Sequence, residues 1–168
     1  FWRVRHQQMT YHRNPLFDRS IELPFQHCVA IDWLHTLSLG VFRDFLGTLI
    51  NKLFDTNAWD IDGTAAVRKT PGVSRLQAGL FQFYRDEKAR GITYSEVQRL
   101  DANMFGTSSA PKCRLHGGET IGLLAYSERL IQHFEQALDQ SRIWARTCCS
   151  LLRMKALCDQ AARLLPQQ

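Results

Sequence analysis

The segment from Cys28 to Phe54 limits the possible folds more than any other part of the chain, because a short apolar run leads directly into a long helical pattern. Val29–Ile31 is apolar and largely β-branched, which predicts a short strand. From Asp32 onward, large apolar residues recur every three or four positions, the spacing of one face of an α-helix. These residues are Leu34, Leu37, Val41, Phe45, Leu49 and Leu53, and the face is widened by Trp33, Phe42, Leu46, Ile50 and Phe54. We therefore expect a helix that is buried on most sides.

Two polar residues, Asp32 and His35, stand at the entrance of this helix with the spacing D-x-x-H. An aspartate there is a favoured N-cap, worth about 1 kcal/mol, and the helix dipole disfavours protonation of a histidine in the first turn. A carboxylate and an imidazole at a strand-to-helix junction also suit metal or phosphate chemistry. These two residues alone leave both interpretations open.

The run from Ile31 to Phe42, IDWLHTLSLGVF, resembles the [C/D]-x-x-H segment of DDE transposases with an RNase H-like core, as in the CACTA, hAT and Kyakuja-type elements. A later run from Cys113 to Leu124, CRLHGGETIGLL, resembles the basic-then-acidic stretch that opens the helix bearing the family's final catalytic glutamate. The resemblance covers roughly residues 14–135 and is most specific from Asp32 to Gly47. It implies a partial RNase H-like core followed by a helical insertion.

The resemblance also implies a candidate catalytic set consisting of Asp32, His35 and Glu119. Such enzymes hold two divalent cations about 3.5–4 Å apart for phosphoryl transfer, which requires several carboxylates. Asp18 is the sole acidic residue before Glu22, and its surroundings do not resemble a catalytic strand end. We expect no firmly bound cofactor, with Mg²⁺ or Mn²⁺ bound only if the transposase site is intact. A glutamate in the first turn of a helix also has a purely structural use, since it complements the helix dipole by about 0.3–1 kcal/mol.

The resemblance implies a first and a second catalytic aspartate upstream of Asp32, and we identify neither in this sequence. The first residue is also not methionine. We therefore expect a fragment of a transposase without catalysis of its own. The remaining pattern predicts a mainly α, single helical domain over residues 1–168, with at most one or two short strands. Its expected parts are an N-terminal arm at 1–27, the strand and central helix at 28–54, a loop at 55–72, helices at 73–89, 93–105 and 118–138 separated by a loop at 106–112, and a basic helix at 141–165.

The net charge is compatible with a nucleic-acid partner and also with an ordinary basic protein, so it does not decide between them. The chain has 21 Lys and Arg against 16 Asp and Glu, a net charge of +5. Basic residues that alternate with aromatic ones can pair phosphates and stack on bases. The candidate nucleic-acid contacts are Arg3, Arg5 and Arg13 in the N-terminal arm and Arg146, Arg153 and Lys155 in the last helix.

The cysteines give only weak indications of a metal site. There are 5 of them, an odd number, and no C-x-x-C occurs. A weak zinc candidate combines His27, Cys28, Cys113 and His116, although one half is an adjacent pair rather than a short spaced motif. No apolar run approaches the roughly 20 residues of a membrane span, and no signal peptide is evident. We expect no membrane association and an intracellular protein, nuclear if it derives from a transposase.

Two functions are consistent with these patterns. The first is nucleic-acid association inherited from a transposase, with DNA as the partner. The alternative is a helical protein-interaction module, with no nucleic-acid role, whose apolar faces meet the remainder of a transposase core or another helical protein. Binding to DNA should weaken steeply with salt, because counterions are released, whereas apolar association should not.

Overall fold

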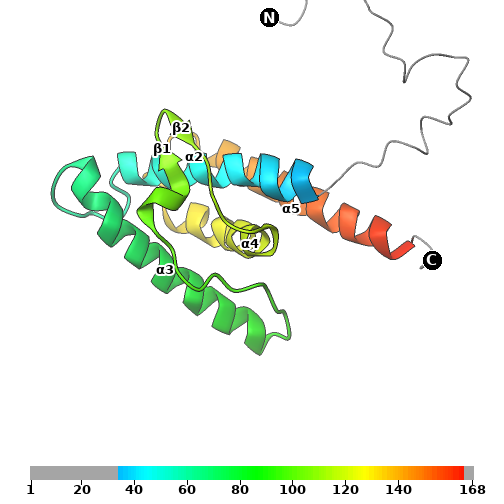
Figure 1. Cartoon of the computed structure of the whole chain (residues 1–168). Coiled ribbons are helices and arrows are strands. Elements are labelled where there is room, and N and C mark those ends of the chain that lie inside the picture. The colour runs from blue at the N-terminus through cyan, green and yellow to red at the C-terminus, as the bar shows by residue number, and fades with distance from the viewer. Residues whose placement is uncertain (1–33, 165–168) are drawn as a thin grey trace, which may run out of the picture. The chain divides into compact units, whose positions relative to one another are not determined.

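Figure 1 shows the computed structural model of the chain, which describes residues 34–164 and the side chains of residues 36–160. The described part is mainly helical, which confirms the predicted fold class. The predicted strand Val29–Ile31 lies outside the described residues. In order, the elements are the π-helix η2 (Leu34–Val41), α2 (Phe42–Asp55), α3 (Ala65–Ala89), the 3₁₀ turn η3 (Ala102–Phe105), β1 (Gly106–Thr107), β2 (Ala110–Pro111), α4 (Gly117–His133) and α5 (Ser141–Leu164).

The helix α2 is buried on most sides, as its apolar pattern predicted. It contacts η2, α3, α4, η3 and both short strands, and α4 in turn contacts η2, α3 and α5. In Figure 1, α4 (yellow) lies between α3 (green) and α5 (orange to red). The buried residues of α2 are Phe42, Leu46, Gly47, Leu49, Ile50, Asn51, Leu53 and Phe54.

The first part of the predicted helix is a π-helix rather than an α-helix. Its i→i+5 hydrogen bonding adds residues to each turn and shifts the register of the apolar face. Leu37 is buried as predicted, but Val41, predicted on the same face, has 44% of its surface exposed. Ser38 is buried in its place. A pattern read at 3.6 residues per turn cannot anticipate this change.

The helix α3 begins eight residues before the predicted start at Val73, since the structure places its first residue at Ala65. Pro71 lies inside it, although proline removes a backbone donor and usually ends a helix. Val67 and Pro71 are both exposed, so water can reach the carbonyl that loses its usual partner. The predicted end at Ala89 is confirmed, and Gly91 follows with φ +82°, a conformation that favours glycine.

The segment predicted as a helix at 93–105 is irregular until η3. Val97, Leu100 and Phe105 are buried as predicted, but the backbone N–H of Leu100 donates to the Gln77 side chain of α3 at 2.7 Å. The chain therefore satisfies its backbone with a neighbouring helix instead of its own turns. Apolar spacing reported the buried residues correctly and the backbone conformation wrongly.

The predicted loop 106–112 contains a small antiparallel hairpin, β1 with β2, in which Gly106 pairs with Pro111 and Thr107 with Ala110. Asn51 in α2 fixes the start of this hairpin, because its side-chain Nδ2 donates both to the carbonyl of Gly47 at 2.8 Å and to that of Phe105 at 2.7 Å. Asn51 is buried, so these bonds satisfy a polar group that would otherwise destabilise the core.

The helices α3 and α4 interlock through two tyrosines and two glycines. Tyr84 of α3 lies against Gly122 of α4, and Tyr126 of α4 lies against Gly79 of α3. A Cβ atom at Gly79 would be 2.1 Å from the Tyr126 hydroxyl, and one at Gly122 would be 2.9 Å from the Tyr84 hydroxyl. The absence of side chains at these glycines therefore sets how closely the two helices approach.

An ion-pair cluster joins the same two helices. Arg129 of α4 donates to Asp86 at 2.8 Å and to the buried Glu87 at 2.7 Å, both on α3. Its guanidinium also lies 4.8 Å from the centre of the Phe83 ring. Hydrogen bonds from Gln82 and then from Arg129 lower the pKa of Asp86. Two anions therefore share one cation that is also held by an aromatic face.

The last two helices differ from prediction at one end only. The helix predicted at 118–138 ends at His133 and is followed by turns to Gln140. Leu138 remains buried within these turns, which explains why the apolar pattern extended to it. The predicted last helix at 141–165 corresponds to α5.

We predict that Gly47→Ala destabilises the fold. A Cβ atom at Gly47 would be 2.5 Å from the backbone nitrogen of Lys112, and backbone cannot move aside as a flexible side chain can. The expected loss is about 1–3 kcal/mol, although alanine normally stabilises a helix interior by about 0.5–1 kcal/mol relative to glycine. Urea unfolding measures this loss.

The matched control is Thr48→Ala, at the next position of the same helix, where the side chain is exposed. This variant should keep its stability within about 0.5 kcal/mol. Equal stability of Gly47→Ala and the unmodified protein would contradict the close approach of α2 to the chain at Lys112.

Candidate functional site

The two sequence segments that carry the transposase resemblance lie side by side in the structure. Arg43, in the Asp32–Gly47 stretch where the resemblance is most specific, accepts a hydrogen bond through its carbonyl from the backbone N–H of Cys113 at 3.0 Å. Its guanidinium donates back to the carbonyl of Leu115. Gly47, in the same helix, lies directly against the backbone at Lys112. The juxtaposition thus rests on backbone groups from both segments.

The predicted catalytic residues are only partly within the described chain. Asp32 lies outside the described residues, and His35 belongs to η2. Glu119 lies in the first turn of α4, where its carboxylate accepts a hydrogen bond from the backbone N–H of His116 at 2.9 Å. This is the reciprocal half of a capping box, in which a side chain at the third helical position satisfies the N-cap backbone. The role of Glu119 that the geometry supports directly is therefore helix capping.

The predicted zinc residues do not form a recognisable cluster in the described part. Cys113 is fully buried, and its burial raises the pKa of its thiol to about 12. His116 is exposed at the start of α4, while His27 and Cys28 lie outside the described residues. Among residues 34–164, no three His, Cys, Asp or Glu side chains are grouped to hold a metal ion.

The candidate nucleic-acid residues of α5 fall on different sides of that helix. Arg146 and Arg153 are exposed and are seven residues apart, which places them on the same side. Arg142, also exposed, is four residues before Arg146 and extends the same row. Lys155 is nine residues beyond Arg146, on the opposite side, where it pairs with Asp159. Arg3, Arg5 and Arg13 lie outside the described residues.

The row of arginines faces away from the protein core. The side of α5 that packs on the domain includes Trp144, Cys148 and Leu151, and helical geometry places these about half a turn from Arg146. Within the described residues, Arg142, Arg146 and Arg153 form no ion pair or side-chain hydrogen bond. We call these three residues the α5 arginine row.

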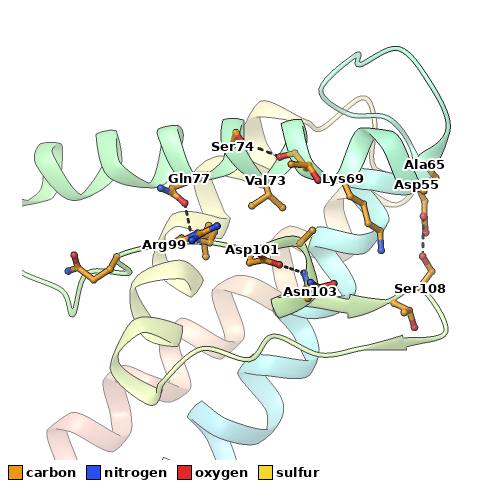
Figure 2. Close-up of a pocket in the computed structure, with 16 residues that line it drawn as sticks. Asp55, Ala65, Lys69, Val73, Ser74, Gln77, Arg99, Asp101, Asn103 and Ser108 are labelled. Carbon is orange, nitrogen blue, oxygen red and sulfur yellow. Dashed lines mark hydrogen bonds between the residues drawn. The ribbon is translucent and has the colours of Figure 1, made fainter.

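A polar groove lies between α3 and the segment Gln98–Ser108, with a volume of about 990 Å³ (Figure 2). Its two carboxylates serve the local structure. Asp55 accepts from the Ser108 hydroxyl at 3.1 Å, and Asp101 accepts from the backbone N–H of Asn103 at 2.9 Å. Two cations, Lys69 and Arg99, also line it, so its charges balance and it has no preference for a polyanion.

Sequence reasoning missed this groove for a specific reason. One wall is the segment 98–108, which the apolar pattern placed in a helix and a loop, and the other includes the first turns of α3, which the pattern placed in a loop. Figure 2 shows Gln77 of α3 reaching across to this segment, where it accepts from Leu100. The polar groups involved show no distinctive spacing in the sequence.

Comparison of the chain with protein-family models, with curated proteins and with solved structures found no significant match. None of the described helices is both long enough and apolar enough to cross a membrane.

We predict that Glu119→Ala destabilises the protein by about 1 kcal/mol, because it removes the acceptor that caps the His116 N–H. Glu119→Gln keeps an acceptor oxygen and should lose less. Thermal unfolding with and without millimolar Mg²⁺ or Mn²⁺ separates capping from metal binding. A metal-dependent rise in Tm that vanishes in Glu119→Ala would show that the carboxylate is a metal ligand and not only a cap.

We also predict a strong difference in thiol reactivity. Only the thiolate reacts with iodoacetamide, and burial raises the pKa values of both Cys113 and Cys148. At about pH 8, the exposed Cys149 should be alkylated while these two thiols resist until the protein is unfolded. Peptide mass spectrometry reports each site, and rapid alkylation of Cys113 in the folded protein would contradict its burial.

The raised pKa of Cys113 also makes the stability of the fold depend on pH. Because folding raises the pKa of Cys113 from its usual 9.0 to about 12, the folded state favours the protonated thiol. The stabilisation is fully present below the unfolded pKa and decreases as the pH rises from about 9 toward 12. Cys113→Ser should reduce this alkaline loss.

Proposed function

We propose that this domain associates with nucleic acid through the α5 arginine row and has no catalytic activity of its own. The observation that supports this proposal is the distribution of charge. Residues 34–140 contain twelve Lys or Arg and twelve Asp or Glu, whereas α5 contains five basic residues and one acidic residue. The positive excess of the described chain is therefore located on a single helix.

The geometry of the row suits a phosphate backbone. Arg142 and Arg153 are eleven residues apart, which corresponds to about 16 Å along a helix axis. Duplex DNA presents one negative charge per roughly 1.7 Å of its axis, so phosphates are available over that whole length. Arginine binds phosphate through a planar fork of donors, and these donors have no partner within the described residues.

The domain's origin is part of the same proposal. The two segments that resemble a DDE transposase are joined through Arg43, Gly47 and Cys113, as expected if both descend from one catalytic core. The aspartates needed to hold two metal ions would then come from outside this chain. DNA association without independent cleavage follows from that arrangement, since a single aspartate and a single glutamate, Asp32 and Glu119, cannot hold both ions.

A second candidate function rests on an apolar strip beside the arginine row. Ile143, Met154 and Leu157 are 58%, 38% and 57% exposed, and their spacings of eleven and three residues place them along one side of α5. Such a strip suits a partner helix. Under this alternative the domain is a protein-interaction module, and Ile143→Gln with Leu157→Gln would abolish association while the arginine variants would not.

The experiment that tests the proposal replaces Arg142, Arg146 and Arg153 together by glutamine. Each phosphate contact contributes about −0.9 to the slope of log K against log salt for B-DNA. The triple variant should therefore bind a mixed-sequence duplex more weakly and with a slope reduced in magnitude by about 2.7. Fluorescence anisotropy at several salt concentrations measures both quantities.

The control changes net charge by the same amount elsewhere, in Arg85→Gln, Lys88→Gln and Arg114→Gln, all exposed. It should keep most of the affinity and nearly the full slope. Equal losses in both triple variants would mean that net charge alone drives binding, which would contradict the assignment to α5. Unchanged binding in the α5 variant would also contradict it.

A further inference from the structure

A second groove, of about 440 Å³, lies between α3 and α4 and differs in kind from the one in Figure 2. Rings supply much of its lining, and every titratable side chain that lines it is an arginine, a histidine or a tyrosine, with no Asp or Glu. The residues that matter for its chemistry are Trp59, Arg75, Tyr126, Arg129, His133 and Phe134.

Gly79 lines this groove and lets the Tyr126 side chain of α4 lie close against α3. The Tyr126 hydroxyl occupies part of the space that a side chain there would fill. Trp59 and Phe134 close one part of the lining, with ring centres 5.2 Å apart in an edge-to-face arrangement. His133 lies against Phe134, with ring centres 4.6 Å apart. The rings thus hold one another in place before any ligand arrives.

The two arginines have different roles. Arg129 is committed to Asp86 and Glu87, so its charge is already neutralised. Arg75 is exposed, and its one side-chain bond within the described residues runs to the backbone carbonyl of Trp59. A guanidinium has five donors, so Arg75 keeps donors and a full charge for an anion beside the Trp59 ring.

We propose that this groove binds a nucleoside phosphate, with the base against the rings of Trp59 and His133 and the phosphate on Arg75. Aromatic side chains stack on bases of any sequence, and arginine pairs the adjoining phosphate. The volume falls within the 300–1,000 Å³ typical of small-ligand sites. The positive, acid-free lining favours an anion over a neutral or cationic aromatic ligand. The site is separate from the α5 arginine row, so it does not depend on the proposed function.

The first test titrates the folded protein with AMP, adenosine and inorganic phosphate, following tryptophan fluorescence and heat of binding. AMP should bind more tightly than either part alone. Arg75→Gln keeps a donor for the Trp59 carbonyl and should weaken AMP binding about ten- to hundredfold while leaving adenosine unchanged. Trp59→Phe should remove most of the fluorescence change, because phenylalanine does not emit in the wavelength range of tryptophan.

A second variant and a control keep the result interpretable. His133→Ala removes an exposed stacking ring and should weaken both AMP and adenosine about five- to hundredfold. Arg99→Gln removes a cation from the groove of Figure 2 and should change neither. Equal loss in Arg99→Gln and Arg75→Gln, or no binding of AMP or of an oligonucleotide, would overturn the proposal.

A titration with a short single-stranded oligodeoxyadenylate distinguishes a free nucleotide from an unpaired base within a strand as the ligand. Binding of free AMP with the same dependence on Arg75 identifies a free nucleotide as sufficient. Binding of the oligonucleotide alone, again lost in Arg75→Gln, identifies an unpaired base within a strand. The α5 triple variant separates this site from the proposed function, because AMP binding should persist in it even where duplex binding is lost.

Discussion

The structure depends on a backbone-to-backbone approach between α2 and the chain that leads into α4. Gly47 permits it by having no side chain, and the carbonyl of Arg43 accepts the N–H of Cys113 at 3.0 Å. Asn51, also in α2, donates a side-chain hydrogen bond to the carbonyl of Phe105 in η3. Such contacts are specific because each buried backbone group must find a partner. They fix where the hairpin lies and where α4 begins, and α4 in turn positions α3 and α5.

The same contact shows what sequence could and could not predict. The burial of α2, the end of α3 at Ala89 and the whole of α5 followed from local periodicity and from a glycine after a helix, which depend on nearby residues only. The irregular segment before η3 and the hairpin depend on partners far away in sequence. Leu100 needs Gln77, and Phe105 needs Asn51. Apolar spacing identifies which residues are buried, but it does not identify where the backbone finds its hydrogen bonds.

The candidate sites also differ in whether their residues have a recognisable sequence signal. Arg146 and Arg153 could be singled out because a basic run on a long helix is visible in sequence, whereas the pairing of Lys155 with Asp159 on the opposite side of that helix became evident only in the structure. The groove beside Trp59 had no sequence signal, since its lining comes from a loop and two helices separated by tens of residues. Glu119 was singled out correctly as a helix-start residue, and its bond to His116 gives it a structural use that the resemblance alone would not suggest.

The distribution of charge then connects the fold to its proposed use. A neutral body has little long-range attraction for a polyanion, so binding should be governed by the helix that bears the excess. The ion pairs of Arg129 contribute to this separation, because they neutralise a cation that would otherwise add to the groove between α3 and α4. Within the described residues, what remains in that groove is one guanidinium without an ion-pair partner, on Arg75, beside rings that pack edge to face. A row of cations suits the repeated charge of a duplex, whereas one cation beside rings suits one phosphate and one base. The two surfaces should therefore differ in salt dependence as well as in ligand, with a steep slope for the α5 arginine row and a slope near that of one contact for the groove.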